Sequence, residues 1–280
     1  MQTNIALIAL DLDGTLLQPD GSIAPRDREA LLGAASKGVQ LVASTGRCLE
    51  GIPKNVFSEL DIRWALTANG AAVYDARTGE AIYERCMDAP LAAEIMRRVM
   101  PLECVSMMFS DGKIYIDETE HSKPERLLFP KGFIDYVRAN RHFIPDLIGG
   151  LERGELRAQK IAMDFRTDPD GTPHDRAKAA ELLSGLKGIT CVCGGGTNME
   201  ITLEGVDKGV GLKALCDRLG ITLSRCMAMG DSENDLALLL AAGVGVAMGD
   251  SPKHVRDAAD YVTGTNRECG VAQAVARFVP

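Results

Sequence analysis

Two aspartates separated by one residue follow an uninterrupted apolar run near the start of the chain. Residues 5–10 read Ile-Ala-Leu-Ile-Ala-Leu, and Asp11-Leu12-Asp13-Gly14 follows directly. An apolar run without polar alternation is typical of a strand buried on both faces, as in a parallel sheet. Ligands of open α/β sheets bind at the carboxyl ends of the strands. The two carboxylates therefore stand where a cation or a substrate would bind.

Two simpler interpretations of this acidic pair remain open at this point. The pair can be a solvated turn after a strand, which requires no ligand. A calcium loop needs glycine at its sixth position and glutamate at its twelfth. Counted from Asp11, these positions hold Leu16 and Ser22, which disfavours calcium. The functional interpretation depends on whether other strand ends supply further polar groups.

The composition is that of a globular chain and argues against nucleic acid and membranes as partners. The 280 residues, 46% of them hydrophobic, allow one large or two ordinary domains with a sizeable core. A net charge of -8 is unfavourable for binding nucleic acid or an anionic membrane. No basic region precedes the first apolar run, and none of the eight cysteines forms a Cys-x-x-Cys pair. We therefore expect a cytoplasmic protein with reduced cysteines, whose oligomeric state the sequence does not predict.

Alternating strands and helices in both terminal parts of the chain predict a parallel α/β sheet. The middle of the chain differs, because Ser110-Asp111-Gly112 predicts a hairpin between helices. We predict a Rossmann-like core made of residues 1–83 and 191–280, with an α+β domain inserted at 84–190. The elements predicted outside the hairpin include helices at 25–37, 88–100, 176–186 and 208–219, one that ends at Leu240 and one that begins at Pro252, and strands at 39–44, 64–69, 159–165, 225–229, 244–248 and 261–263.

Polar residues stand at four predicted strand ends, and a lysine opens a helix from the same half of the chain. This set suits phosphoryl transfer through an aspartyl phosphate. A carboxylate nucleophile repels a phosphate dianion, so a metal must bridge them, and Mg²⁺ accepts a few carboxylates, waters and a phosphate oxygen. A hydroxyl and a lysine can bind other phosphate oxygens, while a second acid protonates the leaving oxygen. The residues are Asp11, Asp13, Ser44, Thr45, Asn69, Asp231, Asn234, Asp235 and Lys208.

Four motifs, in this order, resemble those of the haloacid dehalogenase-like superfamily, and within it the Cof-type phosphatases. The resemblance covers roughly 80 residues at each end of the chain. It implies that the inserted α+β domain is a cap that selects the substrate. The motifs are Asp11-Leu12-Asp13-Gly14-Thr15, Ser44-Thr45-Gly46-Arg47, Gly205-Val206-Asp207-Lys208-Gly209 and Gly230-Asp231-Ser232-Glu233-Asn234-Asp235.

The resemblance implies a role for each motif residue. Asp11 would be the nucleophile and a magnesium ligand, and Asp13 the general acid/base whose backbone carbonyl also binds the metal. Asp231 would be a further magnesium ligand, and Lys208 would neutralise the nucleophile and the phosphate. The remaining implied assignments are Thr45, Gly46, Asn69 and Asn234 for phosphate binding, and Asp235 and Arg47 as supporting residues.

Structural alternatives stay open for four of these residues. Thr45 can be a plain turn residue, and Asp235 can merely support a helix N-terminus. Lys208 can be solvated, although a cation at a helix N-terminus opposes the helix dipole and needs a reason. For Arg47 we favour a structural pairing with an acid over contact with the substrate.

The resulting hypothesis is a magnesium-dependent phosphatase that acts through an aspartyl phosphate. The expected substrate is a small phosphorylated metabolite such as a sugar phosphate, a nucleotide or a cofactor phosphate. One alternative is a phosphomutase or phosphotransferase of the same superfamily, in which another hydroxyl receives the phosphoryl group. The other is a signalling module that stores the aspartyl phosphate without turnover. An inserted domain of about a hundred residues and a second acid at Asp13 favour an enzyme over the module.

Overall fold

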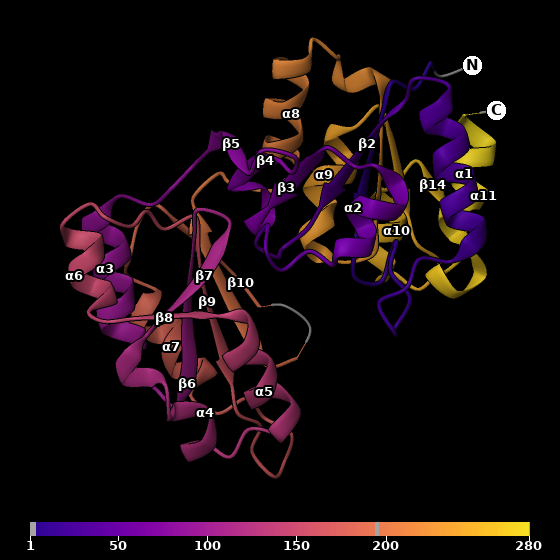
Figure 1. The fold of residues 1–280 in the computed structure, drawn as a ribbon. Helices are drawn as coiled ribbons and strands as arrows, with labels where there is room; N and C mark the ends of the chain where they lie inside the picture. Colours follow the sequence, from indigo (N-terminus) through magenta and orange to yellow (C-terminus); the bar gives the residue numbers. More distant parts are fainter. Residues whose placement is uncertain (1–3, 194–195, 280) are drawn as a thin grey trace. The chain divides into compact units, whose positions relative to one another are not determined.

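A computed structural model describes residues 4–193 and 196–279 of the chain. The chain divides into two compact units (Figure 1). The core unit comprises Met1–Glu84 and Val206–Pro280, and the inserted unit comprises Arg85–Gly205.

Among the described residues of the core unit, eight strands form one sheet. All neighbours from β14 to β3 are parallel, and β4 and β5 extend the sheet as an antiparallel hairpin. The strand order is β14 (Tyr261–Val262), β13 (Val244–Ala247), β12 (Cys226–Gly230), β1 (Leu7–Asp11), β2 (Gln40–Ser44), β3 (Trp64–Thr67), β4 (Ala72–Asp75) and β5 (Glu80–Glu84).

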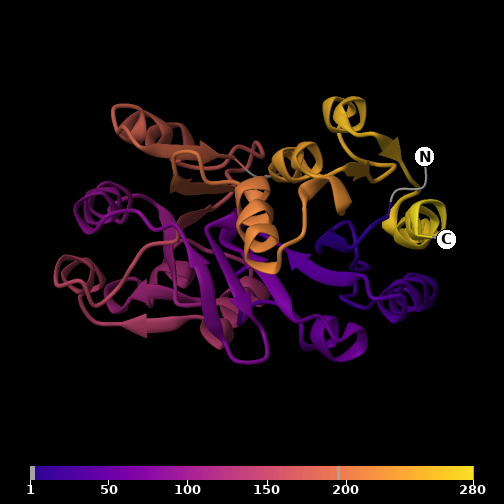
Figure 2. The same cartoon turned by 90° about the horizontal axis from the view of Figure 1, so that it is seen from above.

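Helices cover both faces of the core sheet, which is why β1 is apolar throughout. Ile8 and Leu10 pack in the same apolar cluster as α1, α2 and α11, whereas Leu7 and Ala9 pack with α8, α9 and α10. Figure 2 shows the early helices, in indigo and purple, on one side of the sheet and the orange helices on the other. The helices are α1 (Pro25–Ser36), α2 (Lys54–Leu60), α8 (Lys208–Leu219), α9 (Leu236–Ala241), α10 (Lys253–Ala258) and α11 (Gly270–Phe278).

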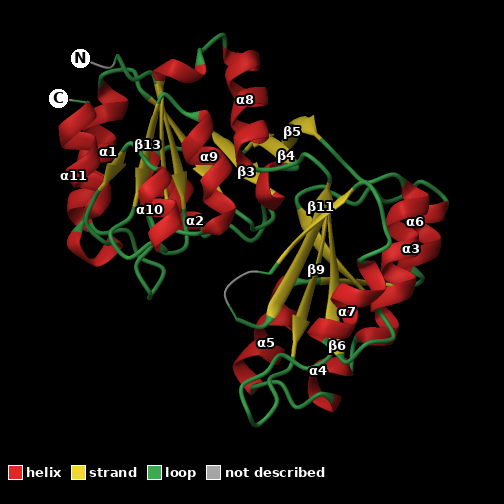
Figure 3. Cartoon of the chain, turned by 180° about the vertical axis from the view of Figure 1, so that it is seen from behind, coloured by secondary structure: helices red, strands yellow, loops and turns green. Residues whose placement is uncertain are grey.

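The inserted unit contains a second, mostly antiparallel sheet of six strands within its described residues. Helices α3, α6 and α7 bury their apolar sides in a cluster on one face of this sheet (Figure 3). The strand order is β10 (Ile189–Val192), β11 (Asn198–Leu203), β9 (Lys160–Phe165), β6 (Cys104–Ser110), β7 (Lys113–Asp117) and β8 (His142–Ile144). The helices are α3 (Ala89–Val99), α4 (Lys123–Arg126), α5 (Lys131–Asn140), α6 (Leu147–Glu152) and α7 (Arg176–Leu183).

The predicted fold class, a parallel α/β core with an inserted α+β part, is confirmed. The C-terminal boundary of the inserted unit differs from the expected one. β10 pairs with β11, and β11 pairs with β9, so the inserted unit continues to Gly205 rather than ending near residue 190. Among the described residues, no helix is long and apolar enough to cross a membrane.

Candidate active site

The carboxyl ends of three neighbouring parallel strands bring predicted site residues to one edge of the core sheet. β1 ends at Asp11, which is in register with Ser44 at the end of β2. On its other side β1 pairs with β12, which ends at Gly230 immediately before Asp231. Because the three strands run in the same direction, their last residues meet at this edge.

Lys208 is the first residue of α8, and two carboxylates hold its ammonium group. Nζ lies 2.7 Å from Asp11 Oδ1 and 2.5 Å from Asp235 Oδ1, and the side chain is fully buried. The Asp207 carboxylate caps the helix by accepting a hydrogen bond from the backbone N of Val210 at 2.8 Å. A lysine at this position opposes the helix dipole, and its two anionic partners offset that cost. The alternative of a solvated lysine is therefore wrong.

Two glycines allow the backbone to approach these residues closely. Gly70 has φ +89°, and a Cβ there would lie 2.0 Å from the carbonyl oxygen of Asp207. Gly14 has φ +92°, and a Cβ there would lie 2.7 Å from a carboxylate oxygen of Asp231. Both positions combine left-handed backbone with tight contact, so only glycine fits. A side chain at Gly70 would displace the start of α8 and Lys208 with it.

Burial dominates the electrostatics of this cluster. It raises the pKa of Asp11 well above its usual value, and the charge of Asp235 adds to this while Lys208 opposes it. Burial, followed by the charge of Asp235, also raises the pKa of Asp231 to about 6. For Lys208, burial disfavours the ammonium, but Asp11 and Asp235 outweigh burial and raise its pKa. The cluster thus contains three carboxylates and one ammonium, which pairs with two of them, and the surplus negative charge would be neutralised by a bound cation.

The carboxylates form a group whose donor atoms suit a hard cation. One oxygen each of Asp11, Asp231 and Asp235 lies within 4.8 Å of the others. Asp235 already has protein partners, because Oδ1 faces Lys208 and Oδ2 accepts from the backbone N of Asp231 at 3.1 Å and of Ser232 at 3.0 Å. Asp11 and Asp231 are therefore better suited to ligate a metal. Two carboxylates leave positions for waters and a phosphate oxygen, which fits Mg²⁺.

Thr15 is a member of this site that the sequence argument did not single out. Its buried Oγ1 donates a hydrogen bond to Asp231 Oδ1 at 3.0 Å. This bond orients the Asp231 carboxylate and leaves its second oxygen for another partner. The available signal was the place of Thr15 in the first motif, directly after Gly14.

The Asp13 side chain lies outside the buried carboxylate cluster and pairs with Arg47. Oδ2 accepts from Arg47 Nε at 2.8 Å and Oδ1 from Nη2 at 2.7 Å, while Nη1 donates to the carbonyl oxygen of Gly51 at 2.8 Å. The Asp13 side chain is 57% exposed. A bidentate ion pair of this kind fixes the orientation of a carboxylate. Arg47 thus makes the pairing with an acid that we favoured for it.

The loops after β2 and β3 are hydrogen-bonded to each other, and they bring three predicted phosphate-binding residues together. The carbonyl of Thr45 accepts from the backbone N of Asn69 at 3.2 Å, and Asn234 Nδ2 donates to Asn69 Oδ1 at 3.3 Å. The Thr45 hydroxyl accepts from the backbone N of Arg47 at 3.2 Å. Gly46 lies in the same turn. This contact also agrees with a turn role for Thr45, so its phosphate role stays a prediction.

The sequence profile of the haloacid dehalogenase-like hydrolases matches residues 8–275. The chain belongs to this family. It is 29% identical to the 5-amino-6-(5-phospho-D-ribitylamino)uracil phosphatase YcsE of Bacillus subtilis, covering 99% of this chain and 96% of the relative. It is 30% identical to the phosphatase YwpJ of the same organism, covering 95% and 97%. A crystal structure of a haloacid dehalogenase-like hydrolase from Bacteroides thetaiotaomicron superimposes with a TM-score of 0.78 at 26% identity, covering 98% and 99%.

The family predicted from the four motifs, a haloacid dehalogenase-like hydrolase of the Cof type, is confirmed. The chain is a phosphatase.

Proposed function

We propose that this haloacid dehalogenase-like enzyme is a magnesium-dependent phosphomonoester hydrolase that works through a phosphoryl group on Asp11. The observation that carries the proposal is the buried Asp11–Lys208–Asp235 chain of ion pairs beside Asp231. A buried carboxylate with a fixed ammonium neighbour and a cation-binding acid is what attack on a phosphate dianion requires. Bound Mg²⁺ would supply charge neutralisation between Asp11 and the phosphate, held by Asp11, Asp231 and the backbone carbonyl of Asp13.

The chain's own residues divide the two chemical steps between them. In the first, Asp11 attacks phosphorus, the bond to the leaving oxygen breaks, and Asp13 gives that oxygen a proton. In the second, Asp13 takes a proton from water, the water oxygen bonds to phosphorus, and inorganic phosphate leaves Asp11. Lys208 stays charged throughout and stabilises the negative oxygens, with Thr45, Gly46, Asn69 and Asn234 as further phosphate contacts.

For the substrate we propose a small phosphorylated metabolite: a sugar phosphate, a nucleotide or a cofactor phosphate. Two relatives bear names of this kind, the aminouracil phosphatase above and the HMP-PP phosphatase of Cronobacter sakazakii, 27% identical over 87% of this chain. The inserted unit would act as the cap that selects the leaving group. The eight free cysteines agree with a reducing, cytoplasmic location.

A phosphate-release screen over these three substrate classes, with Mg²⁺ present, tests the proposal. We expect catalytic release of inorganic phosphate from at least one class. An isomeric phosphate ester without phosphate release would indicate a phosphomutase or phosphotransferase. Labelling of the protein with one phosphoryl group and no turnover would indicate a signalling module.

We expect Mg²⁺ to support turnover and Ca²⁺ not to. Ca²⁺ takes more oxygen ligands at longer distances and can engage both oxygens of Asp11, which removes the nucleophile. Turnover in calcium should stay at the level seen in chelator. Melting curves with each ion provide the control, because an ion that binds raises the melting temperature whether or not turnover occurs. Full activity in chelator, or equal rates with both ions, would contradict the proposal.

We expect Arg47→Ala to impair the proton transfer rather than phosphate binding. Without the bidentate ion pair to Arg47, Asp13 loses its fixed orientation, and kcat for an alkyl phosphate should fall by about 10–100-fold. Nitrophenyl phosphate, whose leaving group hardly needs a proton, should be affected much less. Arg28→Ala is the matched control, because Arg28 pairs with Glu59 at 2.8 Å on the surface of the same unit. Equal losses on both substrates would assign Arg47 another role.

A further inference from the structure

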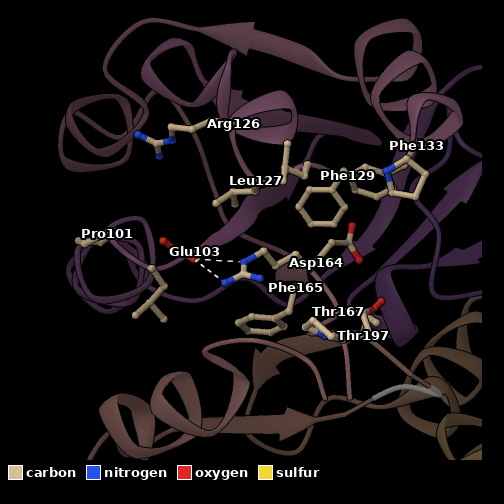
Figure 4. Close-up of a pocket in the computed structure, with 15 residues that line it drawn as sticks. Pro101, Glu103, Arg126, Leu127, Phe129, Phe133, Asp164, Phe165, Thr167 and Thr197 are labelled. Atoms are coloured by element: carbon tan, nitrogen blue, oxygen red, sulfur yellow. Dashed lines mark hydrogen bonds and ion pairs between the residues drawn. The ribbon is translucent and has the colours of Figure 1, made fainter. Parts of the chain in front are cut away.

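The inserted unit contains a hollow of its own, with a volume of about 1130 Å³ (Figure 4). It lies where β9 ends and β6 begins, and the connection between α4 and α5 forms another wall. Lys160 at the start of β9 pairs with Thr202, near the point where the chain leaves the unit at Gly205, whereas Asp164 pairs with Asn198 at the opposite end of these strands. The hollow therefore lies at the end of the inserted sheet that is remote from this exit, and residues of the inserted unit alone line it.

An acidic side chain lines the hollow at this end of the sheet. The Asp164 carboxylate accepts no hydrogen bond from any residue within 4–193 and 196–279. Burial raises its pKa to about 6, with Arg141 and Lys160 opposing this and Glu200 adding to it. Asn198 is its neighbour in register on β11, but Asn198 does not line the hollow. The Asp164 carboxylate is half-buried and lines the hollow, so a ligand bound there can provide the donors that the protein does not.

Aromatic rings line the hollow beside this carboxylate. Phe129 and Phe133 stack with their ring centroids 4.5 Å apart and their planes 21° from parallel. Figure 4 shows the Asp164 carboxylate close to these rings, with Phe165 and the buried Leu127 further along the wall. Half-buried rings next to an acceptor without a donor suit a flat molecule that is apolar on its faces and carries N–H groups on its edge.

A cation without a partner lines the same hollow. Arg126 is exposed, and its guanidinium makes no hydrogen bond or ion pair with any described residue. Arg166, by contrast, is held by Glu103 at 3.2 Å and by Asp168 at 2.7 Å. In Figure 4, Arg126 and the stacked rings lie on opposite sides of the view. The end of the hollow at Arg126 therefore suits an anionic group.

We propose that this hollow is a binding site for a planar heterocycle that presents adjacent N–H donors to Asp164 and carries an anionic group toward Arg126, as a guanine-type nucleotide does. The ring stacks on Phe129 and its donors bind Asp164. This site belongs to the inserted unit and is additional to the carboxylate cluster of the core unit. It does not depend on the chemistry proposed for Asp11.

Calorimetric titration with guanosine in chelator tests the ring site, because guanosine has no phosphate and no metal is present. Saturable binding is expected with the wild-type chain and with Asp11→Asn. Binding should weaken at least tenfold in Asp164→Asn and in Phe129→Ala. Asp170→Asn is the matched control, because Asp170 is fully exposed in a neighbouring loop and its replacement should change nothing. Guanosine 5′-monophosphate should bind more tightly than guanosine, and Arg126→Gln should remove that advantage.

Melting curves show whether the Asp164→Asn variant is folded, and their pH dependence gives a second test of the burial of this carboxylate. The folded-state pKa of Asp164 is raised, so its ionised form destabilises the fold, and this penalty is complete above about pH 6 and absent below about pH 4. Asp164→Asn should therefore melt at a higher temperature than the wild type at pH 7.5 and at a similar temperature at pH 4. Absence of saturable guanosine binding by the wild-type chain would overturn the proposal, as would equal binding by wild type, Asp164→Asn and Phe129→Ala.

Discussion

Lys208→Ala is expected to lower kcat by about a thousandfold or more, because it removes the buried ammonium that stabilises the nucleophile and the phosphate. It should also lower the free energy of unfolding by about 3–5 kcal/mol, since Asp11 and Asp235 lose a buried partner. The pKa of Asp11 is already raised, and loss of Lys208 raises it further. A raised carboxyl pKa stabilises the protein at low pH and loses this effect as pH rises, so the deficit should shrink on acidification.

Lys213→Ala provides the matched control for this experiment. Lys213 lies in the same helix, but it is exposed and pairs with Asp217 at 2.5 Å. Its replacement should change stability by less than about 1 kcal/mol and leave kcat unchanged. Steady-state kinetics and urea unfolding measure both quantities. A folded Lys208→Ala enzyme that turns over within a few-fold of the wild type would remove Lys208 from the mechanism.

Asp11→Asn and Asp13→Asn are expected to fail in different ways. Asp11→Asn removes the nucleophile, so neither step occurs. Asp13 is exposed and paired with Arg47 outside the buried cluster, so Asp13→Asn leaves Asp11 and Lys208 in place. With nitrophenyl phosphate the first step should then survive in part, because this leaving group hardly needs a proton. The second step lacks its base, and the phosphoenzyme should accumulate.

Rapid-mixing kinetics and intact-protein mass spectrometry distinguish the two variants. Asp13→Asn should release a burst of about one equivalent of nitrophenol, followed by slow turnover, and should carry one phosphoryl group. Asp11→Asn should show neither. Exchanged behaviour would reverse the two roles, and a phosphoryl group on serine or histidine would end the aspartyl-phosphate mechanism.

Features that depend on neighbouring residues were predictable from the sequence. A helix was expected at 88–100, and it forms as α3, where the Asp88 carboxylate caps the first turn by accepting a hydrogen bond from the backbone N of Leu91 at 2.9 Å. The turn at Asp111 and Gly112 was expected from a hairpin signal, and both residues have positive φ, 47° and 74°. Capping and tight turns follow local hydrogen-bond and steric rules, which act over a few residues.

Elements whose identity depends on distant partners were missed or misplaced. The β4–β5 hairpin and helix α2 were not predicted, because short segments carry little periodicity. The strands β10 and β11 lie next in sequence to the returning core pattern, and we assigned residues 191–205 to the core. The pairing of β10 with β11, and of β11 with β9, places both strands in the inserted unit. Strand pairing depends on residues far apart in the sequence, so the residues near position 190 are not enough to predict where the inserted unit ends.

Apolar runs and helix caps are local signals, and they were enough to predict that Asp11 and Asp231 lie at the ends of buried parallel strands and that Lys208 begins a helix. The burial of Lys208 between two carboxylates, one of them 197 residues away along the chain, is a property of the complete fold. So are the pairing of Asp13 with Arg47 and the position of Asp164, without a donor, beside two stacked rings. Burial and charge pairing depend on atoms that the whole fold brings together, whereas strand and helix ends depend on a few consecutive residues.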